Sequence, residues 1–341
     1  MSEIRIDPIT GRHVIFAVER DLRPSDLWNI AREINPMTEI KYMEKCPFCR
    51  GNESATPKEI IKVPDDEMWK VRVFLNKFPA IEKANQNNGS KIKSHSIYEK
   101  YSGIGTHEVI VEAPEHNINY FKMTIEDFTI FIEVMFSRYK TIIKNKDIEY
   151  VSFFKNHQKL AGASLFHPHS QLIGLNSVPD FVKYEVEGSK GYFDKTHFCP
   201  YCHILKLELR KKERLVYENE YFAVICPFAP KYKYETWILP KKHLPYFELE
   251  EQIKDLATAL FNCFQAMHSV LGDFPFNMFL HALPKTMKSG EIYYHYHFEI
   301  NPRISGNAGF ELGTGIYINS IYPEEAAKNL KAALEKLKEV K

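Results

Sequence analysis

Residues 162–171 read GASLFHPHSQ, and the histidine pair inside this stretch, His167 and His169, has a counterpart in HYH at 295–297. Each pair follows a lone histidine at almost the same distance, 51 residues in the first case and 52 in the second. A C-x-x-C pair precedes each lone histidine. Because this order of features occurs twice, the sequence indicates an internal duplication. The lone histidines are His116 and His243, and the C-x-x-C pairs are Cys46-Pro47-Phe48-Cys49 and Cys199-Pro200-Tyr201-Cys202.

Strand-like and helix-like segments repeat in the same order between these markers. Apolar residues at helical spacing predict one long amphipathic helix in each half, and short apolar runs predict the flanking strands. The pattern favours an α+β fold of two duplicated halves, residues 1–185 and 186–341, each an antiparallel sheet with a packed helix. The predicted pairs are strands 71–80 and 221–230, helices 124–144 and 249–271, and strands 149–154 and 276–283. A last helix is predicted from Pro323 onward.

Composition limits the class of protein. Hydrophobic residues make up 44% and charged residues 26% of the 341 residues, which is typical of a folded globular chain. The formal net charge is +1, so nucleic acid is not an expected partner. The sequence has neither a long apolar run nor an apolar leader, so we expect a cytoplasmic protein without a membrane partner.

The two C-x-x-C pairs, which we expect in Pro-containing turns, predict two metal sites. Two cysteines spaced by two residues hold one tetrahedral ion together with two further nitrogen or sulfur ligands, and zinc is the ion most often bound in this way. A redox pair is the alternative for a C-x-x-C motif alone, and His197, His203 and His297 are rival ligands for the second site. Iron could also occupy that second site. The predicted ligand sets are Cys46, Cys49, His116 and His167, and Cys199, Cys202, His243 and His295.

The HPHSQ strand predicts a nucleophile. Side chains two residues apart share one face of a strand, so His167, His169 and Gln171 should lie together. With His167 on a metal and one nitrogen of His169 bonded to a backbone carbonyl, the other nitrogen of His169 could attack phosphorus. Gln171, Ser164 and the backbone of Gly162 and Ala163 could then donate to phosphate oxygens. A metal-binding strand without catalysis is the alternative.

Three features are shared with a known family: Asn156, the stretch 162–171, and the opening RIDPITGRHVI at 5–15 with Arg20, Arg23 and Pro24. They resemble the galactose-1-phosphate uridylyltransferase family of the histidine-triad superfamily. The resemblance covers nearly the whole chain. It implies a ping-pong exchange in which His169 carries the nucleotide and Gln171, Asn156 and Ser164 assist. It also implies substrate contacts from Arg20, Arg23 and Asn76, and a homodimer.

One segment departs from the well-known galactose enzymes. Where they carry a Tyr-Glu pair that contacts the hexose, FELGTGIYIN has Thr314 and Gly315. This pattern is similar to a plant relative that phosphorolyses ADP-glucose. We therefore expect UDP-glucose–hexose-1-phosphate uridylyl transfer, with adenylyl transfer from ADP-glucose or a dinucleoside polyphosphate to phosphate as the alternative. A non-catalytic two-zinc binding module is the third hypothesis. Gly313 and Thr314 are expected to approach the substrate through a Gly-rich turn.

Overall fold

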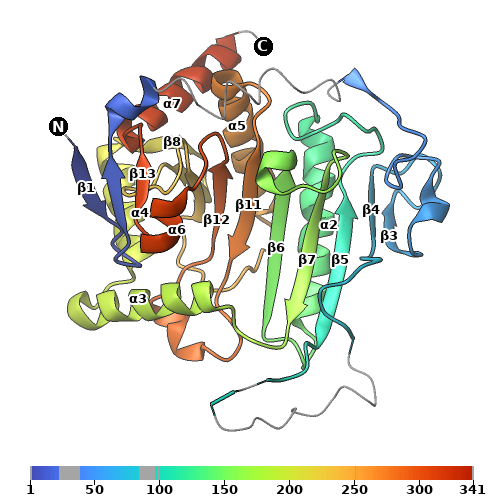
Figure 1. Ribbon diagram of the computed structural model, residues 1–341, viewed down its shortest axis with the longest axis horizontal. Helices are drawn as coiled ribbons and strands as arrows, with labels where there is room; N and C mark the ends of the chain where they lie inside the picture. Colours follow the sequence, from blue (N-terminus) through green and yellow to red (C-terminus); the bar gives the residue numbers. More distant parts are fainter. Residues whose placement is uncertain (1, 23–38, 84–96, 99, 250, 340–341) are drawn as a thin grey trace.

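A ten-stranded antiparallel sheet runs through the whole molecule in the computed structural model, which describes residues 2–22, 39–83, 97–98, 100–249 and 251–339 (Figure 1). Each named strand in this sheet pairs antiparallel with its neighbours. In spatial order the strands are β3 (Glu59–Val63), β4 (Val71–Leu75), β5 (Gly105–Val111), β7 (His169–Leu175), β6 (Tyr150–His157), β11 (Phe276–His281), β12 (His297–Pro302), β10 (Thr236–Pro240), β9 (Phe222–Ile225) and β8 (Leu215–Glu218).

The order of these strands confirms the α+β fold and displays the duplication. Reading outward from the centre, β6-β7-β5-β4-β3 on one side matches β11-β12-β10-β9-β8 on the other. The sequence predicted a sheet for each half, whereas β6 pairs with β11 and joins the two into one sheet. This pairing leaves neither strand with an exposed edge.

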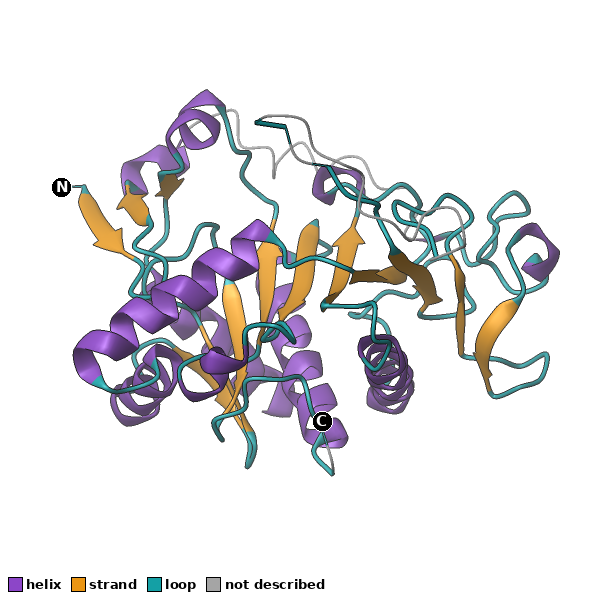
Figure 2. Ribbon diagram, turned by 90° about the horizontal axis from the view of Figure 1, so that it is seen from below, coloured by secondary structure: helices purple, strands orange, loops and turns teal. Residues whose placement is uncertain are grey.

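Helices cover both faces of the sheet because successive strand residues point to opposite sides. Phe222, Val224 and Ile238 join the core beneath α2 (Ile125–Ile143), α5 (Ile253–Leu271) and α7 (Pro323–Glu339). Their neighbours Ala223, Ile225, Trp237 and Leu239 pack instead with α3 (Asp180–Thr196) and α4 (Pro200–Lys211). The sheet therefore lies between two helical layers in this half, and Figure 2 shows helices on both sides of the strands.

A small sheet brings the two ends of the chain together. Strands β1 (Glu3–Ile6) and β2 (His13–Phe16) are antiparallel, and β13 (Tyr317–Asn319) is parallel to β2. Consequently β2 lies between β1 and the last strand of the chain, β13. The predicted boundary between residues 185 and 186 falls inside α3. The remaining short helices are η1 (Val18–Leu22), η3 (Glu53–Ala55), η4 (Lys159–Ala161), η5 (Lys288–Ile292) and α6 (Gly309–Thr314).

Predicted helices agree closely with the observed ones, with local corrections. Thr124 caps α2 through its side chain, as its position before the apolar pattern suggests. The second long helix starts at Ile253 rather than at 249. The predicted Gly-rich turn around Gly313 and Thr314 is the short helix α6, because its N–H groups bond backward along the chain. No helix among the described residues is long and apolar enough to cross a membrane.

Candidate active site

The first Cys/His set converges just before the start of β7. One ligand atom from each of Cys46, Cys49, His116 and His167 lies within 4.8 Å of the others. Cys49 Sγ is 3.5 Å from Nδ1 of His116 and 3.5 Å from Nδ1 of His167. Tetrahedral zinc with sulfur and nitrogen ligands requires ligand-to-ligand separations of about 3.5 Å. The donor set therefore fits a tetrahedral ion.

Backbone contacts orient His167 for this role. Its Nε2 donates to the carbonyl of Ala113 at 2.8 Å, so Nδ1 carries the lone pair that faces the cluster. Burial lowers the pKa of His167 to about 3, which keeps the imidazole neutral. The sequence placed His167 on the strand, but β7 begins at His169. His167 instead lies just before the strand, where its ring reaches the cysteine pair.

The second set repeats this arrangement. Cys199, Cys202, His243 and His295 also lie within 4.8 Å of one another, with Cys202 Sγ 3.2 Å from Nδ1 of His243. Nε2 of His243 and of His295 donate to backbone carbonyls at 2.8 Å each. This C-x-x-C pair opens α4 instead of lying in a turn, because Cys199 is the N-cap and Pro200 begins the helix.

Neither His203 nor His297 joins that second set. His203 Nδ1 is 2.6 Å from the hydroxyl of Tyr192, and His297 lies in a third buried group with Glu185, His281 and Glu299. In this group Glu185 pairs with His281 at 2.8 Å and Lys231 pairs with Glu299 at 2.9 Å. Lys231 therefore balances Glu299, and although burial alone would lower the pKa of His281, its pairing with Glu185 raises that pKa. The other predicted rival ligand, His197, ends α3 in the left-handed conformation and is outside all three groups.

His169 is held with one nitrogen facing a pocket. Its Nδ1 donates to the carbonyl of His167 at 2.8 Å, which leaves Nε2 with the lone pair. Burial lowers the pKa of His169 below its usual value, and the positive charge of Lys155 acts in the same direction. Lys155 also donates to the carbonyl of His169 at 3.4 Å and pairs with the buried Glu112. Neutral imidazole with a free Nε2 is the nucleophilic form.

Gln171 is oriented by His107, a residue that the sequence analysis missed. The backbone N–H of Ala80 donates to Nδ1 of His107 at 3.2 Å, so the ring proton is on Nε2. That Nε2–H donates to Oε1 of Gln171 at 2.7 Å. Asn76 Nδ2 approaches the same oxygen at 3.4 Å. With its oxygen engaged, Gln171 presents its NH₂ group as the donor that can reach a phosphate oxygen.

The pocket in front of His169 has a volume of about 190 Å³. Its polar lining residues are Thr56, Asn76, Lys77, Ser164, His169 and Gln171, and its apolar wall includes Phe48, Phe74, Val109 and Leu165. Such a pocket combines an apolar wall with polar groups that converge beside it. The structure thus brings four of the predicted site residues together.

Other predicted residues lie differently. Gly162 adopts φ 87°, which favours glycine, and the N–H groups of Gly162 and Ala163 donate within their own turn at 2.9 and 3.1 Å. They are therefore not the free phosphate donors that the sequence suggested. Arg20 is exposed in η1, and neither it nor Gly313 or Thr314 is among the residues that line the pocket. Arg23 lies outside the described residues.

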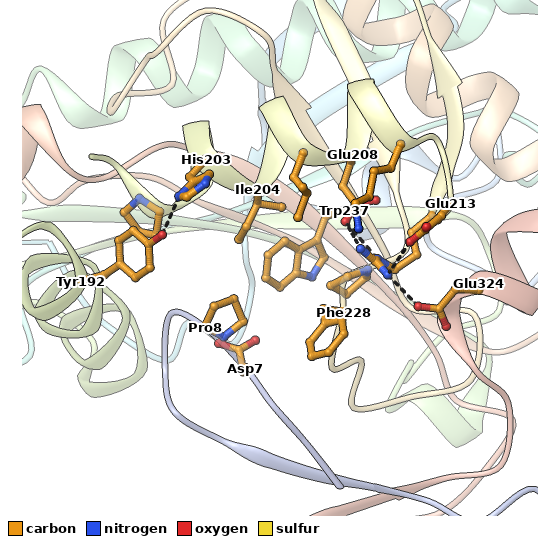
Figure 3. Close-up of a pocket in the computed structure, with 15 residues that line it drawn as sticks. Asp7, Pro8, Tyr192, His203, Ile204, Glu208, Glu213, Phe228, Trp237 and Glu324 are labelled. Carbon is orange, nitrogen blue, oxygen red and sulfur yellow. Dashed lines mark hydrogen bonds and ion pairs between the residues drawn. The ribbon is translucent and has the colours of Figure 1, made fainter. Parts of the chain in front are cut away.

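A second cavity of about 530 Å³ lies in the other half of the molecule (Figure 3). Trp237, Phe228 and Ile204 form apolar walls, and Arg214 lies between the carboxylates of Glu208 and Glu324. Of the predicted metal ligands and catalytic residues, only the rival ligand His203 is among the described residues that line this cavity. Four of the predicted site residues line the pocket at His169 instead.

Comparison with known families identifies the chain. A family profile described as "Galactose-1-phosphate uridyl transferase, N-terminal domain" matches residues 1–179. The chain belongs to the galactose-1-phosphate uridylyltransferase family. A second profile, described as a domain of unknown function, matches residues 113–341. Membership in the galactose-1-phosphate uridylyltransferase family makes this protein an enzyme of the nucleotidyltransferase class.

Relatives within the family carry two names. The chain is 34% identical to ADP-glucose phosphorylase of Arabidopsis thaliana, covering 96% of this chain and 91% of the relative. It is 28% identical to galactose-1-phosphate uridylyltransferase of Thermotoga maritima, covering 97% and 98%. A crystal structure of an Arabidopsis thaliana ADP-glucose phosphorylase with bound ADP-glucose superposes with a TM-score of 0.83 at 33% identity, covering 97% and 98% of the two chains. A uridylyltransferase structure superposes with a TM-score of 0.73 at 29% identity, covering 99% of each chain.

Proposed function

We propose that this enzyme transfers a nucleoside monophosphate from a sugar nucleotide to a phosphate-bearing acceptor through a covalent intermediate on His169. The observation that carries the proposal is the position of His169. Its Nδ1 is fixed by the His167 carbonyl at 2.8 Å, and it lines a pocket together with Ser164 and Gln171. A nucleophile, amide and hydroxyl donors and an apolar slot thus share one small pocket.

In the first step, Nε2 of His169 attacks the α-phosphorus of the sugar nucleotide. The bond between this phosphorus and the bridging oxygen breaks, and sugar 1-phosphate leaves with the electron pair. Positive charge on the imidazole is stabilised by the Nδ1–H bond to the His167 carbonyl. The NH₂ group of Gln171 and the hydroxyl of Ser164 donate to the non-bridging oxygens as charge accumulates there.

In the second step, a phosphate oxygen of the acceptor attacks the same phosphorus. The P–N bond breaks and returns its electron pair to Nε2, which restores neutral His169. Both steps displace good leaving groups, so positioning and charge stabilisation contribute most of the catalysis. Neither step requires an external proton donor for the imidazole of His169.

Two donor and acceptor pairs fit this chemistry. ADP-glucose with phosphate is supported by the higher identity to the phosphorylase, 34% against 28%, and the higher TM-score, 0.83 against 0.73. The segment with Thr314 in place of a hexose-contacting pair supports the same choice. UDP-glucose with galactose 1-phosphate, the first expectation from sequence, is supported by the family profile. We rank ADP-glucose with phosphate first and retain UDP-glucose with galactose 1-phosphate as the second candidate.

Intact-mass spectrometry tests this proposal directly. The protein is incubated with ADP-glucose or with UDP-glucose and no acceptor, and the adduct is mapped by peptide sequencing. We expect an adenylyl adduct on His169, and a uridylyl adduct instead would select the second pair. His169→Gln should form no adduct while keeping the metal content of the wild type. Adduct formation by His169→Gln would disprove the mechanism.

Further expectations concern the metals, the assembly and the location. We propose zinc in both Cys/His sets, with iron as the alternative in the second, because the donor types and separations suit a tetrahedral ion. The ion at the first set would fix His167 and so support the backbone carbonyl that holds His169. The family resemblance supports a homodimer, and we propose a cytoplasmic location. Elemental analysis and light scattering of the purified protein test the metal and the oligomeric state.

A further inference from the structure

Asn277, which lies on β11 in the second half, contacts a predicted site residue and the short helix before Ser164 in the first half. It stands directly opposite Asn156 where β6 and β11 pair. Its Nδ2 donates to Oδ1 of Asn156 at 2.8 Å and to the carbonyl of Ala161 at 2.8 Å. Asn156 is a predicted support of the nucleophile, and Ala161 ends the short helix that leads to Ser164.

These contacts determine which way the amide of Asn156 faces. The carbonyl of Ala161 can only accept a hydrogen bond, so the NH₂ group of Asn277 must face it. The same NH₂ group also reaches Asn156, which must therefore accept through Oδ1. Nδ2 of Asn156 therefore faces Gly162. It is 3.9 Å from the position that a Cβ atom would occupy on that glycine. Asn156 thus points its donor toward the turn that carries Ser164.

A second group of residues holds Asn277 itself. Nη1 of Arg303 approaches Oδ1 of Asn277 at 3.4 Å and the hydroxyl of Tyr232 at 3.3 Å. The guanidinium also stacks on the Tyr232 ring, 4.8 Å from its centroid. Asn307 donates to the same hydroxyl at 3.1 Å, just before α6. The oxygen of Asn277 is therefore turned toward Arg303, which agrees with the orientation deduced from Ala161.

We propose that Asn277 is a positioning residue for nucleotidyl transfer. It fixes the amide of Asn156 and the carbonyl of Ala161, and so the second half supplies part of the reactive site although its own histidine pair lacks a following glutamine. The proposal rests on the function proposed above. Without the donor at position 277, the Asn156 amide can rotate by 180° and present its oxygen to the turn.

The test is a double-mutant cycle on the rate of adduct formation, with the sugar nucleotide that labels the wild type. Asn277→Ala should form the adduct about 10-fold more slowly at saturating donor, because the supporting group loses its orientation. The half-saturating donor concentration should stay within about twofold, since Asn277 does not line the pocket. Adding Asn277→Ala to Asn156→Ala should slow the reaction less than about threefold further, because the two residues act together.

Asn277→Asp separates the hydrogen bond from the packing. Aspartate keeps the shape and can still pair with Arg303, but it cannot donate to Asn156 or Ala161. It should be as slow as Asn277→Ala and should fold even where the alanine variant does not. Asn301→Ala is the matched control, because Asn301 lies opposite Asn277 on β12, and its rate should stay within about twofold of the wild type.

The outcomes are distinguishable. A wild-type rate in Asn277→Asp, or rate losses that multiply in the double variant, would overturn the role of Asn277 alone. Absence of an adduct in the wild-type protein with either donor would overturn the proposed function and this inference together.

Discussion

At the level of single residues, the reactive pocket depends on which atoms carry protons. His107 accepts from the backbone at Nδ1 and donates from Nε2, so the amide of Gln171 can face in only one direction. Burial lowers the pKa of His107, which keeps the ring neutral and able to accept from Ala80. His107 does not line the pocket, yet it sets the orientation of Gln171, which is the proposed hydrogen-bond donor to phosphate.

Replacing His107 tests this control. His107→Phe keeps an aromatic ring of similar size but cannot donate to Gln171, so the carbamoyl group can turn its oxygen toward the substrate. We expect adduct formation on His169 to slow by about 10-fold to 100-fold, a loss comparable to or below that of one oxyanion donor. Rapid-quench mass spectrometry measures the rate. His13→Phe, at an exposed position on β2, should react like the wild type, whereas an unchanged rate in His107→Phe would refute the role.

At the level of elements, α2 is tied to the strand that borders β7. Arg138 of α2 donates twice to the carboxylate of Glu108 on β5, at 2.8 and 2.7 Å. The side chains of Arg138 and Glu108 are 12% and 3% exposed. Glu108 follows His107 directly, so the same strand carries a structural ion pair and a pocket residue. Burial makes the pair sensitive to the loss of one partner.

Arg138→Met should destabilise the fold by about 3 kcal/mol, because it leaves the Glu108 carboxylate buried without its cation. Thermal unfolding followed by circular dichroism measures the change. Adding Glu108→Gln should recover part of the lost stability, since the uncompensated charge is then removed. Equal unfolding temperatures for the wild type and Arg138→Met would show that the pair contributes nothing.

At the level of the whole molecule, an ion cluster joins the two ends of the chain. Glu324 of α7 pairs with Arg5 of β1 at 2.8 Å and with Arg214, next to β8, at 2.6 Å. Burial alone would raise the pKa of Glu324, but the hydrogen bonds from Arg5 and Arg214 outweigh it and hold the pKa below its usual value. The N-terminal strands are thereby fixed to the second half.

A lowered carboxylate pKa has a defined effect on stability. The contribution of Glu324 is present above the pKa that it has in the unfolded chain, about 4.3, and is lost as the pH falls through its folded value. The unfolding temperature of the wild type should therefore exceed that of Glu324→Gln by a constant margin above about pH 5. The margin should shrink at lower pH. A margin that grows on acidification would contradict this assignment.

Much of the fold followed from local pattern. Apolar spacing predicted α2 and the start of α7, and the repeated order of motifs predicted two halves with one Cys/His set each. These features depend on neighbours a few residues apart or on a duplication visible in the sequence. The helices α3 and α4 were missed, and the C-x-x-C pair at 199–202 was expected in a turn.

The sequence by itself determined the residue types that are proposed to bind metal, attack phosphorus and donate hydrogen bonds to phosphate oxygens. Tertiary structure decided how they are oriented, because the partners are distant along the chain: 64 residues separate His107 from Gln171 and 121 separate Asn156 from Asn277. The pairing of β6 with β11 brings the second half against the reactive turn. No local pattern specifies that pairing, since it arises from two strand edges meeting in space.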